Sequence, residues 1–327
     1  MTSCYRREGA GRRPPGEPWH DLLVTSARLP TPLRVVYGLF GIAALTALAF
    51  TVVFFTRWVS SLGPVEAFLA AYPGTAPLPE GRGVGIPPWL SWTHFLNAFF
   101  LLLIIRSGIR IRGEKTPSGL WTSRRVKKRR MSLTIWFHLA IDALWMLNGV
   151  AYVVLLFATG YWVRIVPTSL DVFPHALSAL IQYVSLDWPT HGGWTGYNGL
   201  QQLFYFAIVF LATPLAILTG ARLSAFWPRG DSRLNRAFPV DLAKAIHFPT
   251  MLFFVGFVIV HVGLVLATGA LRNLNAMYGG QDAVNWTGFW IFVASLVAMA
   301  GGWIAARDRV IAPIAQLFGD VRMRPTR

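Results

Sequence analysis

Apolar and polar positions form long alternating blocks along this chain. Six apolar runs lie at 34–57, 89–106, 132–159, 202–221, 246–268 and 286–305. A helix needs roughly 20 residues, at a rise of about 1.5 Å each, to cross the hydrocarbon of a bilayer, and each run approaches or exceeds that length. Polar segments rich in arginine, proline or glycine separate the runs. The pattern predicts an all-α fold, an integral membrane bundle of about six transmembrane helices.

The composition agrees with a membrane protein and excludes two other classes. Apolar residues make up 54% of the chain and charged residues only 13%, whereas soluble domains carry about 25% charged residues. The net charge of +16 does not indicate nucleic acid, because the basic residues lie between apolar runs and not on a soluble domain. The lone Cys4, without a C-x-x-C-H motif, excludes covalent c-type haem.

Lysine and arginine are divided unequally between the two sides of the predicted bundle. Of the 30 basic residues, 26 fall in the first segment, the 106–130 loop, the 222–245 loop and the C-terminal segment. Because basic residues concentrate on the cytoplasmic side, both termini are expected in the cytoplasm of a multi-pass protein of the plasma membrane. The expected parts are a basic tail (1–33), an extra N-terminal helix (34–57), a core (89–305) and a second basic tail (306–327).

One long loop on the outer side is distinctive. Residues 165–201 contain DVFPHALSALIQYV, which predicts an amphipathic helix in contact with lipid at the membrane interface, followed by the turn-rich DWPTHGGWTGYNG. Loops of this length are usually functional. We expect this loop to dock a partner on the outer face, with a simple surface tether as the alternative.

Four histidines fall inside predicted spans, namely His94, His138, His247 and His261. Ionisable side chains inside a membrane are costly and indicate function. The chain direction places His138 and His247 near the inner surface, and His94 and His261 near the outer surface. His247 and His261 are fourteen residues apart, which is about 21 Å along a helix with both side chains on nearly one face.

The two depth-matched pairs suit the axial positions of two b-type haems. Neutral imidazole is a good iron ligand, and bundle cores are where such cofactors bind. The pairs predicted are His138 with His247 and His94 with His261. A structural zinc site fits poorly because it needs four ligands in one place. Packing or helix-end histidines remain the simpler alternative.

Several charged residues lie near the predicted inner haem. Arg106, Arg110 and Lys244 are candidates to bind its propionates, although the positive-inside rule also accounts for them. Asp142 follows His138 by four residues and shares its helix face. It is either a quinone or proton site beside the inner haem, or a structural hydrogen-bonding group.

The four-histidine pattern and three local stretches carry a family resemblance. The stretches are HFLNAFFLLLIIRSGIRI, GWTGYNGLQQLFYFAIVFLATPLAILTG and HVGLVLATGALRNLNAMYG. Over residues 89–305 the chain resembles the di-haem cytochrome b membrane subunits of the bacterial cytochrome b561 and nickel-hydrogenase type, most closely the thiosulfate-reductase-like branch. The resemblance implies a quinone-linked electron conduit, and that branch commonly accompanies molybdopterin oxidoreductases. The extra first helix departs from the pattern.

These observations predict a respiratory electron-transfer subunit. It would pass electrons between a quinone pool and an outer-face, molybdopterin-type oxidoreductase through two bis-histidine haems. The chain shows no phosphate loop, nucleophile triad or cysteine set for iron–sulfur clusters, so substrate chemistry is assigned to a separate protein. The alternative is a transporter or membrane scaffold whose histidines are packing or proton-relay groups. A transmembrane reductase with another electron donor would use the same haems.

Overall fold

The structure is a computed structural model that describes residues 30–75, 85–126, 129–188, 194–228, 230 and 232–324. The predicted tail at 1–33 therefore lies almost entirely outside the described residues, as do 325–327 of the second predicted tail and 189–193 of the outer loop. The chain divides into two compact units, Met1–Phe54 and Phe55–Arg327.

Helix α1 (Thr31–Ser60) makes up the described part of the first unit and continues into the second. Its first 24 residues include one charged side chain, Arg34, and apolar side chains on every face. A helix that is apolar all round is typical of a membrane span rather than of the surface of a soluble domain. This accounts for the extra span expected at 34–57.

Six helical segments are long and apolar enough to cross a membrane, which confirms the predicted number of spans. They are α1, α3 (Pro88–Gly113), α4 (Leu133–Ala158), a composite of α6 (Gly199–Phe206), η2 (Ala207–Ala212, a π-helix) and α7 (Thr213–Leu223), α9 (Val240–Ala267) and α11 (Thr287–Ala305).

The boundaries of these helices differ from the hydropathy blocks for local reasons. Helix α3 continues seven residues past Arg106, because no proline interrupts it and Arg110 and Arg112 in its last turn complement the helix dipole. Helix α9 begins directly after Pro239. Helix α6 begins with a reciprocal capping box, in which the side chains of Asn198 and Gln201 each accept from the other's backbone N–H.

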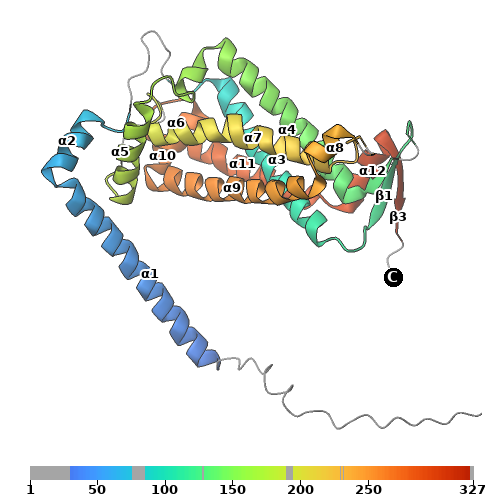
Figure 1. Ribbon diagram of the computed structural model, residues 1–327, viewed down its shortest axis with the longest axis horizontal. Coiled ribbons are helices and arrows are strands. Elements are labelled where there is room, and N and C mark those ends of the chain that lie inside the picture. The colour runs from blue at the N-terminus through green and yellow to red at the C-terminus, as the bar shows by residue number, and fades with distance from the viewer. Residues whose placement is uncertain are drawn as a thin grey trace, which may run out of the picture. The chain divides into compact units, whose positions relative to one another are not determined.

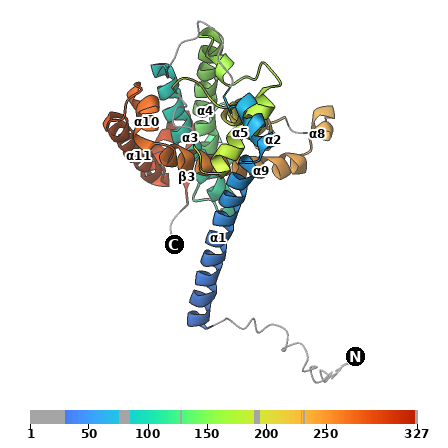
Figure 2. The ribbon, with the colours of Figure 1, turned by 90° about the vertical axis from the view of Figure 1, so that its left-hand side faces the viewer.

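Four of the spans surround one apolar core. Helix α3 packs along α4, and α7 packs along α9, while α3 lies between α4 and α11 (Figures 1 and 2). Near mid-height each core span contributes one side chain to a buried cluster: Leu101, Trp145, Ala212 and Phe254. The rings of Trp145 and Phe254 meet edge to face with centroids 6.3 Å apart. This cluster joins α4 to α9 across the core.

Short helices cover one end of the core, which corresponds to the predicted outer side. They are α2 (Gly63–Ala71), η1 (Tyr161–Arg164), α5 (Val172–Val184), α10 (Ala270–Leu274) and η3 (Asn275–Gly279) (Figure 1). Helix α5 confirms the helix predicted from DVFPHALSALIQYV. It packs on the start of α6, where a Cβ on Gly199 would lie 2.6 Å from Ala176 N and 2.7 Å from Val172 O. Only glycine permits this approach.

The opposite end, at the predicted inner side, carries a small sheet and a helix that the sequence did not indicate. Strands β1 (Gly119–Ser123), β2 (Arg130–Ser132) and β3 (Gly319–Met323) form an antiparallel sheet in the order β2–β1–β3. Helices α8 (Arg233–Ala237) and α12 (Asp308–Phe318) lie at this end as well (Figure 1). Most of the second predicted tail is therefore folded.

The sheet forms because β1 and β2 share a buried face with α12. Trp121 of β1 pairs with Met131 of β2, and both pack with Leu133, Ile311 and Ala315. The Trp121 indole N–H donates to the Ala315 carbonyl at 3.2 Å. The bundle remains predominantly helical, with this sheet as an addition to the all-α expectation.

Candidate functional site

The two outer histidines come together in the core. His94 of α3 and His261 of α9 have ring centroids 6.2 Å apart and ring planes inclined by 58°. Phe257 stacks on His261 at 5.5 Å, and Tyr205 meets that ring edge-on at 6.2 Å. Tyr278 approaches His94 edge-on at 6.3 Å. The two histidines that were predicted to lie at the same depth are thus found on facing helices.

The two inner histidines each bond a hydroxyl on a neighbouring helix. The Nδ1 atom of His138 in α4 lies 2.8 Å from Ser107 Oγ in α3. The Nδ1 atom of His247 in α9 lies 2.9 Å from Thr219 Oγ1 in α7. In both rings, Nε2 is the nitrogen that is not used in these bonds.

Sequence reasoning missed Ser107 and Thr219. Both belong to one short pattern that occurs twice, Ser107-Gly108-Ile109-Arg110 and Thr219-Gly220-Ala221-Arg222. The pattern lies at the inner end of a span in both cases, and that repetition was a signal available in the sequence.

The His94–His261 pair fits the haem cofactor that was predicted from the sequence. A separation of 6.2 Å between the His94 and His261 ring centroids leaves room for one metal atom with a bond of about 2 Å to each imidazole. No group of three or more His, Cys, Asp or Glu side chains gathers within the described residues. Paired imidazoles in an apolar core suit a haem, whose macrocycle supplies the other ligands, and do not suit structural zinc.

Asp142 lies at the inner pair. Its Oδ2 atom is 3.7 Å from His138 Nε2, which exceeds hydrogen-bonding distance. A hydrogen bond between Asp142 and His138 is therefore not formed in this structure. Apart from Asp241 in the first turn of α9, Asp142 is the only acidic residue in the six spans.

The arginines predicted near the inner haem bond to the C-terminal end of α11 and to the start of α12. Arg106 donates through Nη1 to the Ala306 carbonyl at 2.5 Å and lies over the Trp303 ring. Arg110 donates to Asp308 at 2.8 Å. This bond holds the pKa of the Asp308 carboxyl below its usual range. Arg110 is thus committed to a carboxylate of α12.

Lys244, the third predicted propionate partner, has a different environment. Its ammonium group is exposed and lies 3.3 Å from the Asp241 carboxylate, one turn earlier in α9. The contact is an exposed pair, which is worth little energetically, so the lysine retains freedom to turn toward another anion.

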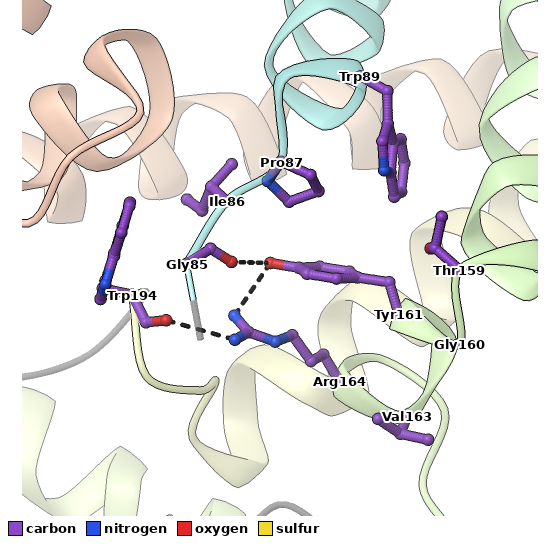
Figure 3. Close-up of a pocket in the computed structure, with 10 residues that line it drawn as sticks. All are labelled: Gly85, Ile86, Pro87, Trp89, Thr159, Gly160, Tyr161, Val163, Arg164 and Trp194. Atoms are coloured by element: carbon purple, nitrogen blue, oxygen red, sulfur yellow. Dashed lines mark hydrogen bonds between the residues drawn. The ribbon is translucent and has the colours of Figure 1, made fainter. Parts of the chain in front are cut away.

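A pocket of about 300 Å³ lies at the outer end of the core (Figure 3). The Arg164 side chain, 2% exposed, donates to Tyr161 Oη at 2.9 Å and to the Trp194 carbonyl at 3.3 Å. Tyr161 in turn donates to the Gly85 carbonyl at 2.9 Å. Burial raises the pKa of Tyr161, so this phenol keeps its proton. Arg164 thus ties three outer segments together, a role that its position in the sequence did not indicate.

A bundle of six apolar spans with the His94 and His261 imidazoles facing each other in its core has the architecture expected of a membrane cytochrome. Comparison with known proteins agrees. The family model described as prokaryotic cytochrome b561 matches residues 85–280, and the chain belongs to that family. It is therefore a multi-pass membrane protein that binds haem b and transfers electrons. Family membership confirms the resemblance seen in the sequence and disfavours the transporter or scaffold alternative.

One curated relative is similar over most of its own length. It is a protein of Azospira oryzae with the provisional name protein-methionine-sulfoxide reductase subunit YedZ1, 29% identical over 206 residues. The aligned region covers 60% of this chain and 96% of the relative. No solved structure matches the chain at a significant level. Helices α1, α11 and α12 lie outside the residues matched by the family model.

The Arg110–Asp308 bond makes a pH-dependent contribution to stability. The folded pKa of Asp308 is depressed, so the contribution is present above the ordinary carboxyl pKa of about 4 and is lost as pH falls through the lower folded value. We expect Asp308→Asn to lower stability by about 0.5–1 kcal/mol at neutral pH, after allowance for solvent screening.

Thermal unfolding of the wild type and the variant at pH 7 and pH 3 measures this effect. The difference between the two proteins should shrink at the lower pH. Asp320→Asn is the matched control, because Asp320 pairs with Arg124 in an exposed position. An equal difference at both pH values would show that the ionised carboxylate is not what stabilises this end.

Proposed function

We propose that this protein is the membrane electron-transfer subunit of an oxidoreductase complex. It carries electrons between a quinone pool and an oxidoreductase on the outer face, through two b-type haems. The observation that supports this most strongly is the contact between the His94 and His261 rings in an apolar core whose other end holds His138 and His247. Substrate chemistry other than quinone redox belongs to the partner protein.

His94 and His261 would hold the haem of the outer site, and His138 and His247 would hold the haem of the inner site. Bound haem iron provides reversible one-electron chemistry. The layer of Leu101, Trp145, Ala212 and Phe254 excludes water between the sites. Arg106 and Lys244 remain the proposed propionate partners at the inner end.

We place the exchangeable quinone beside the inner site, next to Asp142. A hydroquinone presents hydroxyl groups, and a carboxylate is a strong acceptor for them. Asp142 supports this placement because it lies well inside α4 near His138 without a hydrogen bond to it. In this position it orients the quinone headgroup toward the inner site.

We place the partner on the outer end, over the 165–201 loop. The name of the Azospira oryzae relative describes a subunit of a reductase, which suggests a subunit role here, and the family resemblance favours a molybdopterin-type partner. Phe173, Leu177 and Leu180 form an exposed apolar stripe along α5, being 58%, 50% and 46% exposed. Such stripes are typical of surfaces that bind a protein or a membrane.

Haem content tests the central proposal. The purified protein should show a reduced-minus-oxidised b-type spectrum with two haems per chain. His138→Ala should remove one haem and His94→Ala the other, because each removes a ligand from a different pair. A colourless wild-type protein would contradict the proposal and would favour the transporter or scaffold alternative.

Quinol kinetics test the assignment of Asp142. We expect Asp142→Asn to raise the KM for quinol in haem reduction about tenfold, which corresponds to the loss of one charge-assisted hydrogen bond. The haem spectrum and haem content should not change. An unchanged KM with both haems bound would assign Asp142 a structural role.

Co-purification tests the docking surface. Leu177→Glu places a charge on the α5 stripe, and we expect it to release an oxidoreductase that co-purifies with the wild type and contains a molybdopterin cofactor. Val284→Glu is the matched control, since Val284 is an apolar residue of another outer loop and is 72% exposed. Equal loss in both variants, or retention in both, would place the partner elsewhere.

A further inference from the structure

We propose that Ser107 and Thr219 are positioning residues for the inner site. Each hydroxyl accepts a hydrogen bond from the Nδ1–H of an inner histidine, directs the Nε2 atom of that ring to the metal, and lowers the midpoint potential of the inner site relative to the outer one. This inference rests on the proposed function, in which His138 and His247 bind a haem.

The direction of the two hydrogen bonds follows from the backbone carbonyls to which the hydroxyls already donate. Ser107 Oγ donates to the Leu103 carbonyl at 2.8 Å, with the Ile104 carbonyl at 3.0 Å as a second acceptor. Thr219 Oγ1 donates to the Leu215 carbonyl at 2.7 Å. A hydroxyl has one hydrogen, so each oxygen offers only lone pairs to the imidazole.

The imidazoles must therefore donate. The proton of each inner histidine is held on Nδ1, and the lone pair of the neutral ring is left on Nε2, the nitrogen that faces away from the hydroxyl. Ser107 is 1% exposed and Thr219 is fully buried. Water does not compete for these bonds, and the tautomer is fixed before a metal binds.

The repeated pattern around each hydroxyl supports a common role. The next residue is glycine, and a Cβ there would lie 3.5 Å from His138 Cε1 at Gly108 and 3.3 Å from His247 Cε1 at Gly220. At Gly220 a methyl group would crowd the ring, whereas at Gly108 it would make ordinary van der Waals contact with it.

The arginine that ends each pattern anchors the helix. Arg110 bonds to Asp308 of α12, and Arg222 donates through Nε to the Phe238 carbonyl at 2.6 Å, just before α9. Each copy of the pattern thus combines a hydroxyl that orients an imidazole, a glycine beside its ring, and an arginine that holds the inner end of the span.

The hydrogen bonds have an electronic consequence. An acceptor on Nδ1–H makes the imidazole a stronger donor to the metal, as outer-shell acceptors do at other metal sites. A stronger donor stabilises ferric over ferrous iron and lowers the midpoint potential. In the outer pair, the Nδ1 atom of His94 is buried and has no hydrogen-bond partner among the described residues. This contribution favours electron flow from the inner site to the outer site.

Spectroelectrochemical titration of the haem-loaded protein tests the inference. The test variant combines Ser107→Ala with Thr219→Val, which removes both hydroxyls and preserves most of the volume. At a fixed ambient potential, we expect the ferric-to-ferrous ratio of the inner haem to fall about tenfold, equivalent to about 59 mV for one electron. The outer haem should not shift. His94→Ala, which retains only the inner haem, identifies the signal.

Two further variants control for structural effects. Ser107→Thr with Thr219→Ser keeps both hydroxyls and should restore the wild-type potential. Thr250→Val removes a hydroxyl that bonds only the Ile246 carbonyl of its own helix, and it should leave both potentials unchanged.

The outcomes separate the inference from the proposed function. Loss of the inner haem in the Ala/Val variant but not in the hydroxyl-retaining variant would also support positioning. The inference is overturned if both haems stay bound and neither potential moves, or if the hydroxyl-retaining variant behaves like the Ala/Val variant. A wild-type protein without haem would instead reject the proposed function itself.

Discussion

The cost of a polar imidazole in hydrocarbon is the constraint on which this structure depends. Water is absent from the centre of a bilayer, so each ring nitrogen needs a partner from the protein or from a cofactor. The inner rings use hydroxyls of adjacent spans, and the outer rings lie against each other and against aromatic side chains. The four histidines, each of which is costly to place in hydrocarbon, thereby lie near the two ends of the core.

Side chains that face the core recur at intervals of seven residues along the spans. Along α9, His247, Phe254 and His261 follow one another at this interval, and the same interval separates His138 from Trp145. A seven-residue step returns to nearly the same helix face and advances about 10 Å. Helix α9 therefore presents an inner, a middle and an outer side chain to the core. The middle layer is apolar and contains two aromatic rings, Trp145 and Phe254, in contact.

The two ends of the bundle are built differently, which suits a conduit with different partners on its two sides. The inner end has a sheet and α12, held to α3 by Arg110 and Asp308. The outer end has short helices, an exposed apolar stripe on α5 and a buried arginine, Arg164, that joins three segments. The family match ends at residue 280, so α11, α12 and β3 lie outside the matched region.

The sequence by itself determined the six apolar spans and where each histidine lies along its span, because hydropathy and helical rise act within one segment. The direction of the spans, which rests on the basic residues, stays a prediction. The sequence did not indicate that residues 119–132 and 319–323 form one sheet, since those strands pair across nearly 200 residues. Nor did it assign Ser107 to His138 or Thr219 to His247. Only tertiary structure decided these contacts, because they depend on how neighbouring helices rotate and pack. The haem-ligand roles of the histidines stay predictions, although the structure brings His94 and His261 together as their depth required.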